Sequence, residues 1–100
     1  MSTYRVVLHA PTEQSLTRAR SNAANIAAAQ PAAIVEIVVN ADGARAAVQT
    51  PHLETDELIR YCANSLKKQN LDAPKGAKII GSAVLHLIER QGEGWAYVRS

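Results

Sequence analysis

The stretch at residues 34–39 constrains the fold more than any other part of the sequence. It reads Ile-Val-Glu-Ile-Val-Val, which is apolar almost throughout. A strand with one face in solvent alternates apolar and polar residues, whereas a strand with helices on both faces is nearly continuous in apolar residues. The stretch therefore predicts a central strand of a parallel sheet, and the rest of the chain must supply helices for both faces.

Strand-like and helix-like segments alternate along the rest of the chain. Further strands are predicted at residues 4–9, 57–61, 78–80 and 94–99. Helices are predicted at residues 13–29, 44–49, 63–69 and 83–91, the last with Ser82 as its cap. A chain of 100 residues supports one core. We therefore expect a single α/β domain over residues 1–100, a three-layer α/β/α sandwich with a mostly parallel five-stranded sheet.

Residues 54–70 fit two interpretations. Leu58, Ile59, Cys62 and Leu66 follow helical spacing, which favours one continuous helix with Cys62 on its buried face. The alternation of the chain favours a strand at 57–61, followed by a helix that starts just after Cys62. We adopt the second interpretation because of the family resemblance described below.

Several polar residues follow the predicted strands. Open α/β sheets bind ligands outside the carboxyl ends of their strands. We therefore predict one pocket at that edge. Its candidate residues are His9, Asn40, Asp42, Gly43, Cys62, Gly81 and Ser82, with Asn40 to Gly43 expected to form a loop.

Cys62 is the candidate nucleophile, and it is the one cysteine of the chain. A thiol at the first turn of a helix meets unpaired backbone N–H groups, which favour the reactive thiolate. The alternative is that Cys62 packs like a small apolar residue. His9 is either an orienting partner for the thiolate or a hydrogen-bonded structural residue, and His86 is expected to be exposed.

Other classes of protein find little support. The net charge of +2 is small and the basic residues are dispersed, so we expect no nucleic-acid partner. We expect no membrane segment and no secretion signal, and hence a cytoplasmic protein. A single cysteine agrees with a reducing compartment. No phosphate loop, dinucleotide fingerprint, nucleophile elbow or metal-ligand spacing occurs, so we expect neither a cofactor nor a metal.

Three segments together resemble one known family. They are Tyr-Cys-Ala-Asn-Ser-Leu at 61–66, Ile-Ile-Gly-Ser-Ala-Val at 79–84 and the run from Glu89 to Tyr97. They are similar to small YchN-like members of the DsrE/DsrF-like family, which have a Cys-x-Asn-Ser/Thr turn and a final Gln-x-Glu-Gly-aromatic strand. Where family members often have a His-Gly loop after the second strand, this chain has Asn-Ala-Asp-Gly at 40–43.

The resemblance implies a three-layer α/β/α fold, trimers or hexamers, and sulfur relay with a persulfide on the cysteine. Asn64 and Ser65 would then supply hydrogen-bond donors near the sulfur, and His9 would assist. We therefore expect a sulfur-carrier or sulfurtransferase-like protein that exchanges sulfur with a donor or acceptor protein. The alternative is an oligomeric binding module with no catalysis, which binds a small ligand in a pocket at the carboxyl ends of the strands and in which Cys62 serves only as packing. Trp95 and Tyr97 lie near an edge-like last strand and are candidate interface residues.

Overall fold

The computed structural model describes residues 3–100 and contains one five-stranded sheet in the order β4-β3-β2-β1-β5. All four strand pairings are parallel, so the predicted α/β sheet is confirmed and is parallel throughout. The strands are β1 (Arg5–Ala10), β2 (Ile34–Val39), β3 (Ile59–Cys62), β4 (Lys78–Ile80) and β5 (Ala96–Arg99). The α-helices are α1 (Glu13–Ala29), α2 (Ala41–Gln49), α3 (Ala63–Lys68) and α4 (Ala83–Gly92).

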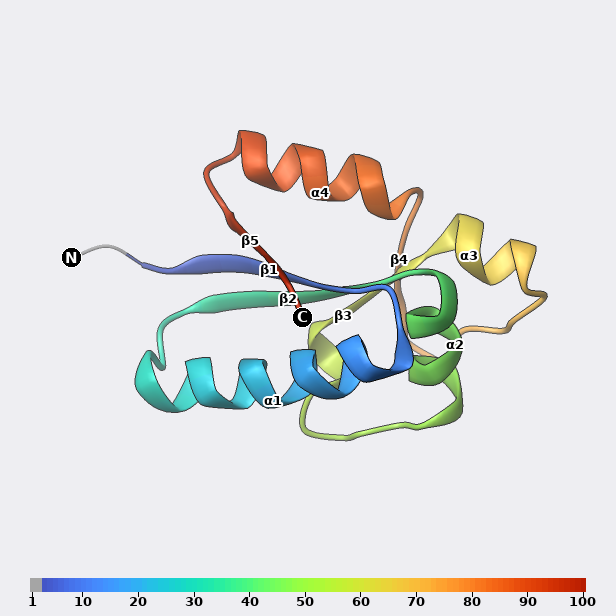
Figure 1. Ribbon diagram of the computed structural model, residues 1–100, viewed down its shortest axis with the longest axis horizontal. Helices are drawn as coiled ribbons and strands as arrows, with labels where there is room; N and C mark the ends of the chain where they lie inside the picture. Colours follow the sequence, from blue (N-terminus) through green and yellow to red (C-terminus); the bar gives the residue numbers. More distant parts are fainter. Residues whose placement is uncertain (1–2) are drawn as a thin grey trace.

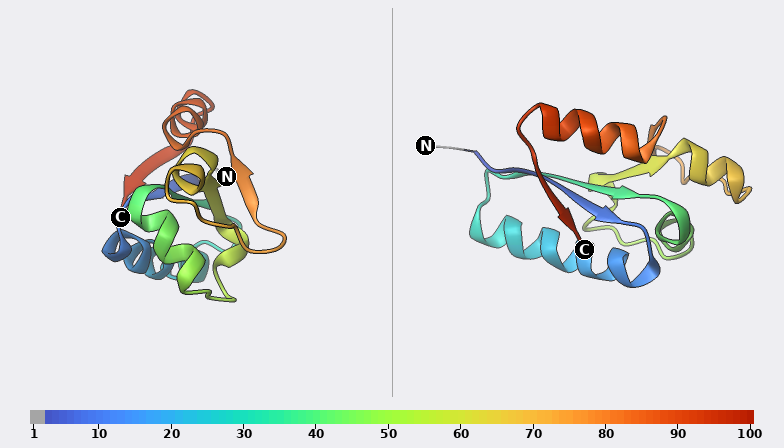
Figure 2. Two further views of the ribbon diagram at one scale, coloured as in Figure 1. Left: turned by 90° about the vertical axis from the view of Figure 1, so that its right-hand side faces the viewer. Right: turned by 45° about the horizontal axis from the view of Figure 1, so that its top comes forward.

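The helices lie on both faces of the sheet, as the central strand requires. Helices α1 and α2 cover one face, α4 covers the other, and α3 lies at the edge where the strands end (Figure 1). Figure 2 shows from two further directions that α4 and α1 lie on opposite faces of the sheet. No helix among residues 3–100 has the length and apolar character that crossing a membrane would need.

The two faces of the sheet have cores of very different size. Strand β2 sends Val35, Ile37 and Val39 toward α1 and α2, and Glu36 and Val38 toward α4. The core under α1 and α2 contains fifteen buried residues, whereas the core under α4 contains five. Because each fully buried aliphatic side chain contributes about 1.5–3 kcal/mol, the first face supplies most of the apolar stabilisation.

Two helices begin at side-chain caps, and the second of them, Ser82, is the cap expected from the sequence. The Thr12 hydroxyl accepts a hydrogen bond from the Ser15 N–H at 3.0 Å, and the Ser82 hydroxyl accepts one from the Leu85 N–H at 3.4 Å. Such a cap satisfies a backbone donor that has no partner within its helix. Along α1, Ala19 and Ala23 are buried, and their small side chains let this helix lie close to the sheet.

Two segment predictions had different outcomes. The strand-then-helix interpretation of residues 54–70 is confirmed, although a short 3-10 turn, Asp56–Leu58, occupies the start of the predicted strand. The predicted loop at Asn40 to Gly43 is wrong, because α2 begins at Ala41. Contacts distant in sequence hold that first turn: the Gly43 N–H donates to the Pro11 carbonyl at 3.2 Å.

Candidate functional site

Cys62 is the last residue of β3 and the N-cap of α3. Its side chain packs with Val7, Val38, Ala83 and Leu87 on the α4 face of the sheet. The residue is 5% exposed, so the thiol lies beneath α4 in the described conformation. The nucleophile hypothesis required a thiol at a strand-to-helix turn, and the packing hypothesis required a thiol in a core. Cys62 has both features.

The surroundings of the Cys62 sulfur stabilise its thiolate. Burial raises the pKa of the thiol, but hydrogen bonds from the N–H and hydroxyl of Ser65 and from the N–H groups of Ala83 and Asn64 outweigh burial. The net result is a lowered pKa. The Ala83 nitrogen lies 3.4 Å from Sγ. Because hydrogen bonds to the charged form favour it, this geometry raises the thiolate fraction near neutral pH.

Ser65 connects the cysteine to α2. Its hydroxyl oxygen accepts a hydrogen bond from the Ala41 N–H at 2.9 Å, which leaves the hydroxyl proton free to point to the sulfur. The Gln69 side chain donates to the Ala41 carbonyl at 2.8 Å. Ala41 has a φ of 48°, a left-handed value that is unfavourable for alanine. These two hydrogen bonds hold that strained residue in place, so α3 fixes the start of α2.

His9 does not reach the thiol. Its Nε2 donates to Asn40 Oδ1 at 3.0 Å, and its Nδ1 lies 2.7 Å from the Tyr97 hydroxyl, which therefore donates to it. Strand β2 separates β1 from β3, which places His9 roughly 10 Å from Cys62 at ordinary strand spacing. Burial and the nearby Arg99 lower the pKa of His9 more than the Asn40 hydrogen bond raises it. Both ring nitrogens of His9 therefore have partners other than the thiol, and its assistance to the thiolate remains a prediction.

The other candidate residues do not form one shared pocket with Cys62. Asp42 points to solvent and pairs with Arg45 at 3.3 Å. Gly43 lies against the β1–α1 connection, where a Cβ would come within 1.8 Å of the Ala10 carbonyl oxygen. Gly81 and Ser82 form the β4–α4 turn and help line a separate hollow. Asn64 and Ser65 are thus the predicted binding residues that contact the sulfur.

The sequence prediction missed a buried charge cluster beside this site. The Glu36 carboxylate points from β2 toward α4, and its side chain is 4% exposed. It accepts hydrogen bonds from His86 Nε2 at 2.7 Å and from Arg90 Nη2 at 2.8 Å, while Arg60 Nε lies 3.5 Å away. Burial raises the pKa of Glu36, but the hydrogen bonds from Arg90 and His86 outweigh it and the pKa is lowered. Arg90 also lies over the Trp95 ring, 4.6 Å from its centroid.

The cluster corrects the expectation that His86 is exposed. Its side chain is 13% exposed and faces the sheet. A signal was present in the sequence: one acid interrupts a buried strand, and His86 and Arg90 stand one helical turn apart on the helix that must cover that strand.

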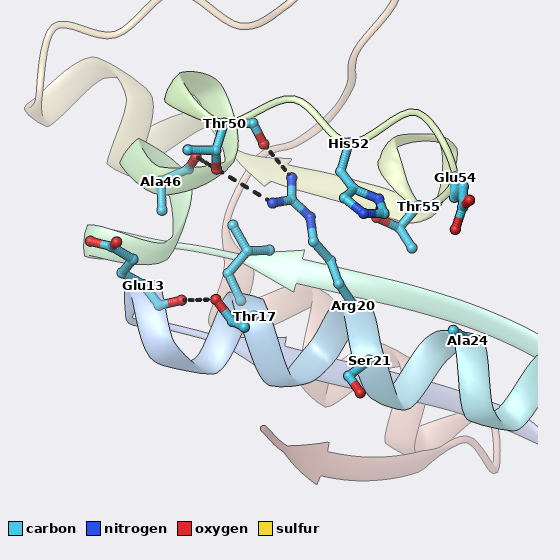
Figure 3. Close-up of a pocket in the computed structure, with 11 residues that line it drawn as sticks. Glu13, Thr17, Arg20, Ser21, Ala24, Ala46, Thr50, His52, Glu54 and Thr55 are labelled. Atoms are coloured by element: carbon cyan, nitrogen blue, oxygen red, sulfur yellow. Dashed lines mark hydrogen bonds between the residues drawn. The ribbon is translucent and has the colours of Figure 1, made fainter.

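A cavity lies on the opposite face of the sheet. It has a volume of about 540 Å³ and is bounded by α1, the end of α2 and residues 50–55 (Figure 3). Arg20 projects into it and donates to the Thr50 carbonyl at 2.8 Å and to Asp56 at 3.2 Å. Glu13 and Glu54 also line the cavity. Since Asp56 already neutralises the guanidinium, the role of Arg20 is structural: it holds residues 50–56 against α1.

No group of three or more His, Cys, Asp or Glu side chains among residues 3–100 is arranged to hold a metal ion. The Cys62 sulfur and its hydrogen-bond donors are the chemically reactive part of the site. These features define the chain as a small α/β protein with an all-parallel sheet and a hydrogen-bonded cysteine at the end of β3.

Among solved structures, the chain is similar to MTH1491, a protein of unknown function from Methanobacterium thermoautotrophicum. The two share 28% sequence identity and superpose with a TM-score of 0.81, over 97% of this chain and 99% of the other. This similarity confirms the fold. No family model matches the chain, and no curated protein matches it significantly.

Proposed function

We propose that this protein carries sulfane sulfur on Cys62 as part of a sulfur relay. The observation that supports the proposal is the set of donors around Sγ, namely the N–H groups of Asn64, Ser65 and Ala83 and the Ser65 hydroxyl. They stabilise a thiolate, which is the nucleophilic form of cysteine. The resemblance of residues 61–66, 79–84 and 89–97 to the DsrE/DsrF-like family supports the same role.

The transfer needs no oxidant. The Cys62 thiolate attacks the outer sulfur of a donor persulfide and forms a new S–S bond, while the donor S–S bond breaks and its electron pair leaves with the donor thiolate. An acceptor thiolate then attacks the outer sulfur on Cys62 and releases the original thiolate. A donor protein and an acceptor protein are therefore the expected partners. The reducing cytoplasm would keep Cys62 free of unrelated disulfides.

Incubation with glutathione persulfide, followed by intact-mass measurement, tests the proposal. We expect one added sulfur, about 32 Da, on the native protein and none on Cys62→Ser, since persulfide formation requires the thiolate. The Ser65→Ala variant should load more slowly, because it loses the hydroxyl donor. A native protein that gains no sulfur while its denatured form is fully alkylated at Cys62 would contradict the proposal.

A second candidate function is favoured by the 5% exposure of Cys62. In it, the protein is an oligomeric binding module and the cysteine is a packing residue. Replacement by a similar apolar group separates the two. If Cys62 only packs, Cys62→Ala should weaken folding by about 1 kcal/mol and leave all activity and ligand binding intact. Sulfur loading of the native protein that Cys62→Ala abolishes would favour the carrier.

We further propose that the protein forms homo-oligomers, as trimers or hexamers. The outer face of α4 exposes Val84, Leu85 and Ile88 by 55% or more, and Val98 on the edge strand β5 is 41% exposed. Val84, Leu85 and Ile88 share one face of α4, and an exposed apolar patch of this kind commonly marks an interaction site. Light scattering at micromolar concentration tests this, and the 10.7 kDa mass of one chain would contradict it. Ile88→Glu should then shift the protein toward monomer, whereas Glu89→Lys should have a smaller effect.

A further inference from the structure

We propose that α4 is a movable cover over Cys62 and that Glu36 is the positioning residue that holds it closed. This inference rests on the proposed sulfur chemistry of Cys62, because a carrier thiol that is 5% exposed must become accessible to its donor. Glu36 therefore regulates both the access to the thiol and the hydrogen bond that α4 gives to it.

The N-terminus of α4 lies directly on the cysteine. The Ala83 N–H, in the first turn of the helix, donates to Sγ at 3.4 Å. Ala83 and Leu87 also pack in the same small core as Cys62. Movement of α4 away from the sheet thus uncovers the sulfur and removes one of its donors at the same time.

The apolar attachment of α4 is weak. Of its ten residues, Ala83 and Leu87 are buried, whereas Val84, Leu85 and Ile88 face solvent. By comparison, α1 and α2 each bury four residues on the opposite face. Elements with few buried apolar contacts open at lower free energy than the rest of a fold. The position of α4 must therefore depend largely on its polar contacts.

Glu36 supplies those contacts. His86, in the middle of α4, and Arg90, one turn later, both donate to its carboxylate, and the Arg90 contact is bidentate at 3.1 and 2.8 Å. The acid comes from the central strand β2, so it ties the helix to the middle of the sheet. Loss of the carboxylate leaves two partly buried donors, on His86 and Arg90, without their acceptor, which favours movement of the helix into solvent.

The surroundings of α4 leave room for this movement. A hollow of about 220 Å³ lies between β4 and the first half of α4, and both Leu85 and His86 line it. Gly81 precedes the helix, and a Cβ there would meet no atom within 4 Å. Gly94 follows the helix with a φ of 92°. Loops with glycine at both ends of α4 can take up the backbone change (Figure 1).

The test measures Cys62 alkylation by iodoacetamide from pH 6 to pH 11, on the full chain. The plateau rate at high pH reports access to the thiol, and the midpoint reports its thiolate equilibrium. Glu36→Gln should raise the plateau roughly tenfold, since local opening exposes the sulfur. It should also move the midpoint to higher pH, because the Ala83 donor is lost. His86→Leu removes one donor and keeps the Arg90–Glu36 pair, so it should also raise the plateau and move the midpoint to higher pH. It replaces Glu36→Gln in the test if that variant does not fold.

Asp56→Asn is the matched control. It makes the same acid-to-amide change in the Arg20 pair on the other face, and it should leave both plateau and midpoint unchanged. An equal rise of the plateau in Asp56→Asn would overturn the proposal, as would unchanged plateaus in both Glu36→Gln and His86→Leu. Sulfur loading is measured separately by mass. If the native protein takes up no sulfur but the variants show the expected alkylation plateaus and midpoints, the sulfur relay is refuted and the proposal that α4 covers Cys62 is retained.

Discussion

Substitution of Gly43 by alanine should destabilise the fold strongly, although alanine favours helices. A Cβ at this position would lie 1.8 Å from the Ala10 carbonyl oxygen and 2.8 Å from its carbon. Such contacts do not occur below 3.0 Å, so the first turn of α2 must move away by more than 1 Å. Both groups are backbone, so no side-chain rotation relieves the clash. The movement also breaks the hydrogen bond from the Gly43 N–H to Pro11.

The magnitude follows from three contributions. Overpacking typically costs about 1–3 kcal/mol, and a rigid backbone obstacle favours the upper end. The lost hydrogen bond adds about 1 kcal/mol. The better helix propensity of alanine returns about 1 kcal/mol. The net loss is about 3 kcal/mol, which corresponds to a fall in Tm of about 15 °C for a domain of this size.

Urea unfolding followed by circular dichroism measures this loss. Gly92→Ala is the matched control, because a Cβ at Gly92, the last residue of α4, would meet no atom within 4 Å. It should be neutral or stabilise the protein by up to about 1 kcal/mol. If Gly43→Ala lies within about 0.5 kcal/mol of the original protein, α2 does not pack on the β1–α1 connection as described.

Two further substitutions test other contacts. Folding lowers the pKa of Glu36, so its contribution to stability is present above the pKa of the unfolded chain and is lost as pH falls through the folded value. Glu36→Gln should therefore be about 3 kcal/mol less stable at pH 7, and the difference should shrink below about pH 4 in urea titrations; a constant difference would contradict this. Arg20→Lys cannot hold Thr50 and Asp56 together and should lose about 1–2 kcal/mol, with faster hydrogen exchange at residues 50–56. Unchanged hydrogen exchange at residues 50–56 would show that the Arg20 contacts do not hold this segment in place.

The arrangement of the elements was predictable because it depends on local patterns. The apolar run at 34–39 identified the central strand, and the helix at 13–29 has the predicted bounds. The placement of Cys62 at a strand end was predicted as well, although helical spacing alone would have put it inside a helix. Such choices between short segments need context beyond local spacing, and here the alternation of the chain and the family resemblance together supplied it.

The details of the site depend on contacts that no local pattern contains. Asn40 starts α2 without a side-chain cap, because its amide oxygen is taken by His9. Ala41 keeps a left-handed backbone because residues from α3 hold it. Glu36 and Arg90 are 54 residues apart in sequence. These tertiary contacts override local propensity, which is why the loop at 40–43 and the exposure of His86 were predicted wrongly.

The pairing of β1 with β5 has a consequence for the order of folding. Val6 pairs with Ala96, about 90 residues away, whereas β1 and β2 are joined by a single helix. Long loops close slowly and at a larger entropic cost, so β1, α1 and β2 should assemble first and β5 should join the sheet last. Helix α4 is anchored on one side by β5 and therefore reaches its final position only in that last step. During folding, Cys62 should remain open to solvent after most of the sheet has formed.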